Sequence, residues 1–135
     1  MKRLVIGQDA IVGPWVCART GGEYTGGVTI GMARDGVLIA GVLFDSWNGR
    51  SMAMHVAADG GGWLTREYLR AAFTYAFVQM KVAKLIGLVD ETNAAARRFD
   101  EHLGFQLEAR ITDAAPKGDL LIYSMTPAQC RYLEA

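Results

Sequence analysis

Three consecutive glycines, residues 60–62, separate a strand-like segment from a helix-like segment, and this arrangement constrains the fold more than any other feature. Residues 51–57 alternate large apolar with small side chains, which is typical of a strand. Residues 65–80 carry apolar side chains at helical spacing, with Thr65 as the expected N-cap. The compact apolar run at residues 84–90 predicts another strand. Strand, helix and strand therefore form a crossover in which the two strands are parallel.

The remaining segments predict one α/β (α+β) domain over residues 1–135, with a mixed central sheet of about six or seven strands flanked by helices. The dipeptides Asp35-Gly36 and Asn48-Gly49 favour tight hairpin turns. The strands outside the crossover are expected at residues 28–34, 37–45, 105–111 and 120–125. A second helix is expected to begin at Asn93 and end at Gly104, and a capping box at residues 126–129 predicts a short closing helix.

The segment before residue 28 is harder to interpret. Residues 9–19 have the pattern of a helix, but we expect Pro14 to break or restart it, because proline lacks the N–H donor that a helix interior needs. The N-terminus has two basic residues but an apolar run of only three residues before Gly7. This pattern is not that of a signal peptide.

The composition excludes several classes of protein. Fourteen basic and fourteen acidic side chains cancel, so we do not expect nucleic acid as a partner, because a general nucleic-acid binder has a basic excess. No apolar run approaches the roughly 20 residues that cross a bilayer. Cys17 and Cys130 are isolated in the sequence, which favours neither a metal site nor a disulfide framework. The expected location is the reducing cytoplasm.

The glycines lie where an anion is expected to bind. At the start of a helix the first backbone N–H groups lack a partner and the helix dipole is positive. Glycine has no Cβ, so a phosphate can approach these amides closely. The sequence matches neither the Walker motif nor the GxGxxG fingerprint, so neither motif names the ligand. The alternative is a flexible glycine-rich loop without a ligand.

Two longer segments, REYLRAAFTYAF and LIGLVDETNAAARRFDEHLGF, together with the strand before the glycines, resemble the GNAT family, the Gcn5-related N-acetyltransferases. The resemblance covers roughly residues 28–126 and is nearest to the compact type often carried by phages and prophages. It implies the GNAT fold and transfer of an acetyl group from acetyl-CoA directly to an amine, which is a protein N-terminus, a lysine or a small amine. For a phage protein it implies the cytoplasm of the bacterial host.

The resemblance also implies where acetyl-CoA binds, namely in the gap where the two parallel strands splay apart. The pantetheine arm would lie along residues 54–57 with Asn93 facing it, and the pyrophosphate would bind the amides of residues 60–65. The implied cofactor-binding residues are Met54, Val56, Ala57, Gly60, Gly61, Gly62, Trp63, Leu64, Thr65, Asn93 and Arg98. Arg66 and Arg97 are further candidates for the CoA phosphates, the alternative being that these arginines are only solvated.

Two residues depart from the family pattern. Trp63 stands where the family loop ends in a small residue, and its side chain either packs under the helix or crowds the phosphates. Asp100 stands where many members carry a tyrosine that acts as the acid for the leaving thiolate. We interpret Asp100 as a carboxylate on the helix surface.

The candidate general base is His55, because histidine titrates near neutral pH and this strand flanks the implied thioester. Asp45 is a second candidate that would act through a bridging water. Each has a structural alternative: His55 would be a hydrogen-bonded or solvated strand histidine, and Asp45 a solvated turn residue. Trp47 and Tyr123 are candidates for lining an acceptor groove.

Three functions stay open at this point. The first is an acetyl-CoA-dependent N-acetyltransferase, and the second is a catalytically silent protein of the same fold that binds partners. The third is transfer of another group, for instance a modified acyl group onto a nucleobase. The acceptor depends on loops at residues 20–27, 45–50 and 112–119. Exposed edge strands of such a sheet often pair with a second copy, so a homodimer is also open.

Overall fold

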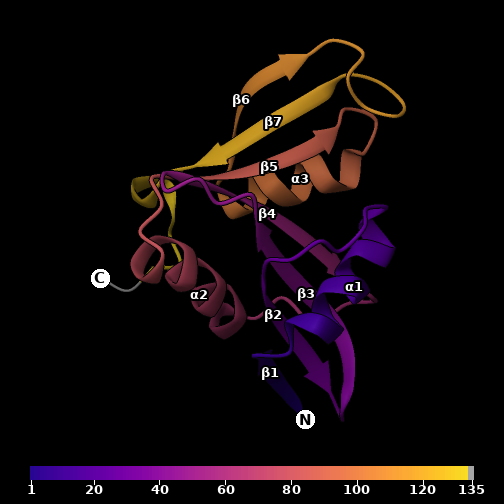
Figure 1. The fold of residues 1–135 in the computed structure, drawn as a ribbon, viewed down its shortest axis with the longest axis vertical. Coiled ribbons are helices and arrows are strands. Elements are labelled where there is room, and N and C mark those ends of the chain that lie inside the picture. Colours follow the sequence, from indigo (N-terminus) through magenta and orange to yellow (C-terminus); the bar gives the residue numbers. More distant parts are fainter. Residues whose placement is uncertain (134–135) are drawn as a thin grey trace.

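The computed structural model describes residues 1–133 and shows a seven-stranded mixed sheet with helices on both faces (Figure 1). This confirms the predicted fold class and the predicted number of strands. In chain order the elements are β1 (Lys2–Ile6), α1 (Asp9–Thr20), β2 (Val28–Arg34), β3 (Val37–Asp45), β4 (Ser51–Ala58), α2 (Arg66–Thr74), η1 (Tyr75–Gln79), β5 (Lys84–Asp90), α3 (Ala94–Leu103), β6 (Gln106–Ile111), β7 (Leu120–Met125) and η2 (Pro127–Gln129).

The strands lie in the order β1-β2-β3-β4-β5-β7-β6. All neighbours are antiparallel except β4 and β5, which are the parallel pair of the predicted crossover. Strand β1 was missing from the sequence prediction. It is an edge strand that pairs with β2, and no residue of it is fully buried. Without a buried face it lacks the apolar alternation by which a strand is recognised.

Helix α1 runs without interruption through Pro14, so the expected break there was wrong. A proline normally clashes with the Cβ of the residue before it. Here that residue is Gly13, which has no Cβ. The helix also buries Val12 and Val16 against β2–β4, with Leu43 in the same apolar cluster. This burial offsets the one backbone hydrogen bond that the proline cannot make.

The helix predicted at residues 65–80 consists of α2 followed by a π-helical turn, η1. Thr65 caps it as expected, since its Oγ1 accepts a hydrogen bond from the backbone N–H of Tyr68. The closing helix is a 3₁₀ turn, η2, with the predicted capping box. None of the helices in the described chain is both long and apolar enough to span a membrane.

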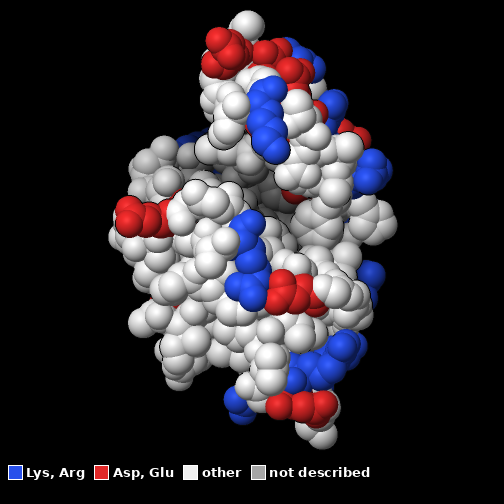
Figure 2. Space-filling view, turned by 90° about the vertical axis from the view of Figure 1, so that its right-hand side faces the viewer, with Lys and Arg blue, Asp and Glu red and all other residues white. Residues whose placement is uncertain are grey.

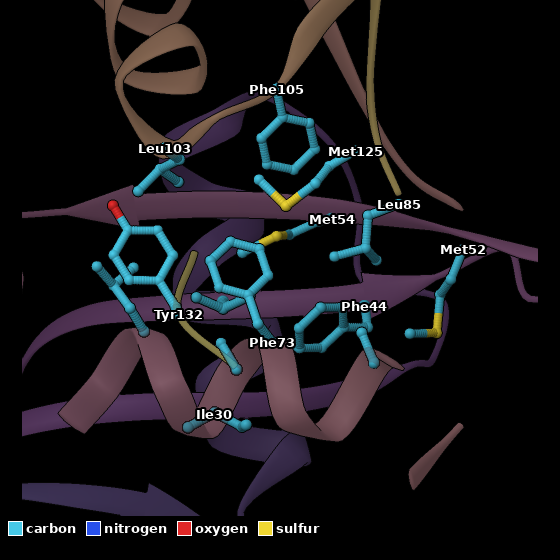
Figure 3. Close-up of a cluster of buried hydrophobic side chains, with 14 of the residues drawn as sticks. Ile30, Phe44, Met52, Met54, Phe73, Leu85, Leu103, Phe105, Met125 and Tyr132 are labelled. Atoms are coloured by element: carbon cyan, nitrogen blue, oxygen red, sulfur yellow. The ribbon is translucent and has the colours of Figure 1, made fainter. Parts of the chain in front are cut away.

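The main hydrophobic core lies between the sheet and the layer formed by α2, η1 and α3 (Figure 3). Met52 and Met54 on β4 point into it, as the strand alternation predicts, together with Phe73 of α2 and Leu103 of α3. The other face of β4 is covered in part by α1, which contacts Ala57. The small side chains predicted on that face are therefore explained by a helix that packs against it.

Candidate active site

Strands β4 and β5 pair over three residues only and then separate. The pairs are Ser51 with Lys84, Met52 with Leu85 and Ala53 with Ile86. Beyond Ala53, strand β4 continues to pair with β3 on its other side. In a strand, backbone groups point alternately to its two sides. The second half of β4 therefore presents unpaired backbone groups to the gap, which is the gap that the sequence resemblance implied.

A cleft of about 1130 Å³ occupies this gap. Figure 2 looks into the hollow between the part of the molecule with β5, β7 and α3 and the part with α1, and acidic side chains are visible in its depth. Seven of the residues predicted for the site line the cleft: Asp45, Met54, His55, Val56, Ala57, Trp63 and Asn93. Parts of two predicted acceptor loops, residues 20–23 and 114–117, also line it.

The glycine loop lies beside the cleft as an exposed turn. Gly60 and Gly62 have φ angles of 72° and 78°, which favour glycine. A Cβ added at Gly60 or Gly61 would meet no atom within 4 Å. Within the described chain, the backbone N–H groups of residues 60–64 donate to no protein acceptor. The loop is thus an open run of free amides at the start of α2, with Leu64 exposed and Thr65 serving as the cap.

Two cations beside the loop were missed by sequence reasoning. Lys2 Nζ donates to the carbonyl oxygen of Gly62 at 2.8 Å. A Cβ at Gly62 would lie 2.8 Å from Nη2 of Arg34. Lys2 and Arg34 are directly opposite each other in the β1–β2 pair. No sequence signal pointed to them, because β1, which contains Lys2, was not predicted, and the pattern of residues 28–34 did not indicate that Arg34 lies beside the glycine loop. Arg98, which was predicted to reach a phosphate, is exposed on α3 and does not line the cleft.

His55 and Asp45 form a direct pair in the wall of the cleft. Nε2 of His55 lies 2.9 Å from Oδ1 of Asp45, and each side chain is about 30% exposed. The two candidate bases therefore contact each other directly, and the role of Asp45 as a base that acts through a bridging water stays a prediction. Asp45 is opposite Ala53 in the β3–β4 register, so Asp45 and His55 are diagonal neighbours on one face of the sheet.

Asp100 was interpreted as a helix-surface carboxylate, and this was wrong. Its carboxylate faces the cleft, and a Cβ added at Gly87 of β5 would lie 3.0 Å from Oδ2. Burial, with a smaller contribution from the negative charge of Glu101, raises the pKa of Asp100 to about 7. A sequence signal existed, because Asp100 is four residues after Ala96 and three before Leu103, on the apolar face of α3.

Trp63 packs between the two helices on this side of the sheet. Its indole contacts Tyr68 of α2 edge-on at 6.1 Å between ring centroids, and Phe99 of α3 at 5.6 Å. The ring therefore forms part of the cleft wall. Asn93 also borders the cleft, and its Oδ1 accepts a hydrogen bond from Ala96 N, which makes it the N-cap of α3.

The two residues predicted for an acceptor groove differ in outcome. Tyr123 is fully buried, and its hydroxyl donates to Glu101 at 2.6 Å, so it lines no groove. Burial is also the main cause that raises the pKa of this phenol. Trp47 is 56% exposed and lines a second, smaller cavity next to Asp45.

No protein-family model matches the sequence, and no curated protein matches it, whereas 241 chains of solved structures match the fold. The chain is similar to the spermidine/spermine N-acetyltransferase SpeG from Vibrio cholerae, with 14% identity over 95% of this chain and 96% of that one and a TM-score of 0.74. It is also similar to yncA from Salmonella typhimurium, whose structure contains acetyl-CoA, with 15% identity, 93% coverage of both chains and a TM-score of 0.71.

A third similar structure is an acetyltransferase of the GNAT family from Bacillus anthracis, at 16% identity over 73% of this chain and with a TM-score of 0.61. The match spans 65% of that protein's length, and 63% of the length of another acetyltransferase. Sequence identities this low indicate a shared fold only. The sheet order, the splayed parallel strands and these matches together show that the chain has the GNAT acetyltransferase fold.

Proposed function

We propose that this protein is an acetyl-CoA-dependent N-acetyltransferase that transfers the acetyl group directly to an amine in the cytoplasm. The observation that carries the proposal is the cleft beside β4, which has a loop of free amides at one end and the His55–Asp45 pair in its wall. The amine acceptor has a precedent in SpeG, whose name gives spermidine and spermine as its substrates.

The chain's own residues fit the donor. Free amides of residues 60–64 suit a pyrophosphate, and Lys2 and Arg34 add positive charge beside them. The unpaired backbone of residues 54–57 offers hydrogen bonds to the amide groups of the pantetheine arm. Acetyl-CoA supplies an acetyl group that is activated as a thioester.

The transfer forms a C–N bond and breaks a C–S bond, so one proton must leave the amine and one must reach the sulfur. In this proposal His55 takes the proton of the amine, and its contact with Asp45 at 2.9 Å supports a role for Asp45 in orienting the imidazole. A base contributes more when the acceptor is an amine of pKa ~10 than when it is an α-amine of pKa ~8.

Asp100 takes the place of the acid. Burial keeps its carboxyl substantially protonated near neutral pH, since its pKa is about 7. A thiol has an ordinary pKa of about 8.5, so proton transfer from such a carboxyl to a thiolate is favourable. Asp100 then gives one proton to the sulfur while His55 accepts one from the amine, and the protons balance.

The alternative function is a silent binding protein of the same fold. The observation that favours it is the Trp63–Phe99 contact, because the two rings occupy part of the cleft wall where the donor would pass. Such a protein would bind partners without turning over acetyl-CoA.

The test is calorimetric titration of the purified protein with acetyl-CoA, for the parent, Gly61→Asp and Gly61→Asn. Space around Gly61 is open, so both variants are expected to fold, and only the aspartate repels the pyrophosphate. We expect micromolar binding by the parent, little change in Gly61→Asn and loss of roughly tenfold or more in affinity in Gly61→Asp. If the folded parent does not bind acetyl-CoA, the acetyltransferase proposal is wrong.

A further inference from the structure

The second cavity, which we call the Trp47 pocket, lies at the ends of β2 and β3 against η1 and has a volume of about 350 Å³. This is the size of a pocket for a small organic molecule. Its walls combine apolar and aromatic side chains, among them Phe44, Trp47, Tyr75, Met52 and Met80, with about as much polar surface. The pocket has no role in binding the donor as proposed above.

The backbone around the Trp47 pocket is unusual in three places. Tyr75 begins the π-helical turn η1, a rare form that is frequently found at functional sites. Ser46 has a φ of 58°, which is uncommon for a residue with a side chain. Gly27 has a φ of 115°, and a Cβ there would lie 2.4 Å from the carbonyl oxygen of Phe44. Deviations of this kind gather at binding sites, where the surrounding structure maintains them.

Charge in the Trp47 pocket comes from one residue. Among the described residues that line it, Asp45 is the only charged one. Burial, and the negative charge of Asp9, raise the pKa of Tyr75, so its phenol stays neutral. A cavity that combines aromatic side chains with one carboxylate is complementary to an organic cation that has one ammonium group and an apolar body.

Asp45 also connects the Trp47 pocket with the main cleft, because it is the only described residue that lines both. Its Oδ1 contacts His55 at 2.9 Å and accepts from Ser46 Oγ at 3.2 Å. Its Oδ2 accepts no hydrogen bond from the described residues. An ammonium group held at Oδ2 would therefore lie next to the proposed general base.

We propose that the Trp47 pocket holds the apolar body of the acceptor, and that the acceptor is a small primary amine on an aromatic or branched apolar group. This inference rests on the proposed acetyl transfer and specifies its substrate class. A polyamine such as spermidine carries several ammonium groups but would meet a single carboxylate here. The pocket therefore selects against the substrates that SpeG is named for.

The first measurement is the binding of phenethylamine, measured by calorimetry with and without acetyl-CoA. It is made for the parent, Trp47→Ala and Val37→Ala. Val37 is 66% exposed at the start of β3 and does not line the pocket, so it controls for loss of surface apolar area. We expect a Kd of about 1 mM or tighter for the parent and for Val37→Ala, and a roughly tenfold weaker one for Trp47→Ala.

The second measurement is thiol release from acetyl-CoA with phenethylamine or spermidine as the acceptor. We expect phenethylamine to have the higher kcat/KM, and Trp47→Ala to raise its KM roughly tenfold with kcat less affected. No binding of phenethylamine under either condition, equal binding by Trp47→Ala, or a preference for spermidine would overturn the inference. If phenethylamine binds and Trp47→Ala weakens it but acetyl-CoA does not bind, the pocket stands as a cation site and the acetyl-transfer proposal fails.

Discussion

At the scale of single residues, the contact between His55 and Asp45 shows which features of the site could be predicted from the sequence and which could not. Both side chains were identified as candidates from the sequence, but their contact was not. A tight turn at Asn48-Gly49 would place Asp45 opposite Met52, on the core face. In the structure the connection is longer and Asp45 is opposite Ala53, which moves it to the face of His55. A shift of one residue moves a side chain across a sheet, and turn dipeptides alone do not fix that register.

The two side chains are in direct contact, so the proposal that they work together as the general base predicts that the effects of their removal are not additive. We expect Asp45→Asn and His55→Gln each to lower kcat/KM for an amine acceptor by roughly 10²-fold, with the affinity for acetyl-CoA unchanged. The double variant should be less than about tenfold worse than either single variant. Steady-state thiol release checks this. Losses that multiply to roughly 10⁴-fold would mean that the two residues act independently.

The raised pKa of Asp100 makes a prediction about stability. An ordinary aspartate has a pKa near 4, whereas that of Asp100 is about 7 in the folded protein. Below pH ~4 the carboxyl is neutral in both states and costs nothing. As the pH rises toward 7 the unfolded chain ionises first, so the folded protein loses stability, and above pH 7 the loss is complete.

Asp100→Asn should therefore raise the free energy of unfolding at pH 8 by about 1–3 kcal/mol, a range that allows for solvent screening. At pH 4 the substitution should have little effect. Urea unfolding at both pH values measures this difference. Asp113→Asn, at an exposed loop position, is the control and should show no such dependence on pH. An equal effect of Asp100→Asn at both pH values would contradict the burial of the carboxyl.

At the scale of elements, the central strands were predicted well because they are compact apolar runs, several of them buried on both faces, and α3 because capping residues mark both of its ends. Strands β2, β3, β5 and β7 have the predicted bounds, and α3 begins and ends where Asn93 and Gly104 indicated. The predictions failed for elements whose formation depends on tertiary contacts. Strand β1 depends on pairing with β2, and α1 continues through Pro14 because its apolar face is buried against the sheet.

Truncation of Trp63 tests how much its packing against α2 and α3 contributes to the stability of the protein. We expect Trp63→Ala to lower the free energy of unfolding by about 2 kcal/mol, because the indole loses its contacts with Tyr68 and Phe99. The exposed Trp47, truncated in the same way, should cost less than about 1 kcal/mol. Urea unfolding of both variants provides the comparison. A large gain in acetyl-CoA affinity in Trp63→Ala would instead mean that the indole crowds the donor.

At the scale of the whole molecule, the sheet consists of two parts that are joined by few backbone contacts. One part contains β1–β4, and the other contains β5–β7 with α3; between them lie the three pairs of β4 and β5 and the core beneath. The sequence predicted the crossover that joins the parts. The splay itself was implied only by the family resemblance, because strand propensity gives no information on where pairing stops.

A ligand that fills the splay contacts both parts and should stabilise the molecule as a unit. At 100 times its Kd, acetyl-CoA adds about 2.7 kcal/mol to the free energy of unfolding, which for a domain of this size raises Tm by roughly 8 °C. Thermal unfolding with increasing acetyl-CoA measures the shift, and hydrogen exchange should show slower exchange in β4, β5 and the loop at residues 60–64. Gly61→Asp should show about half of this shift or less at the same concentration, because its carboxylate lies where the pyrophosphate is proposed to bind and weakens binding roughly tenfold or more. An equal shift in that variant would mean that acetyl-CoA binds elsewhere, since stabilisation through the splay requires the loop amides.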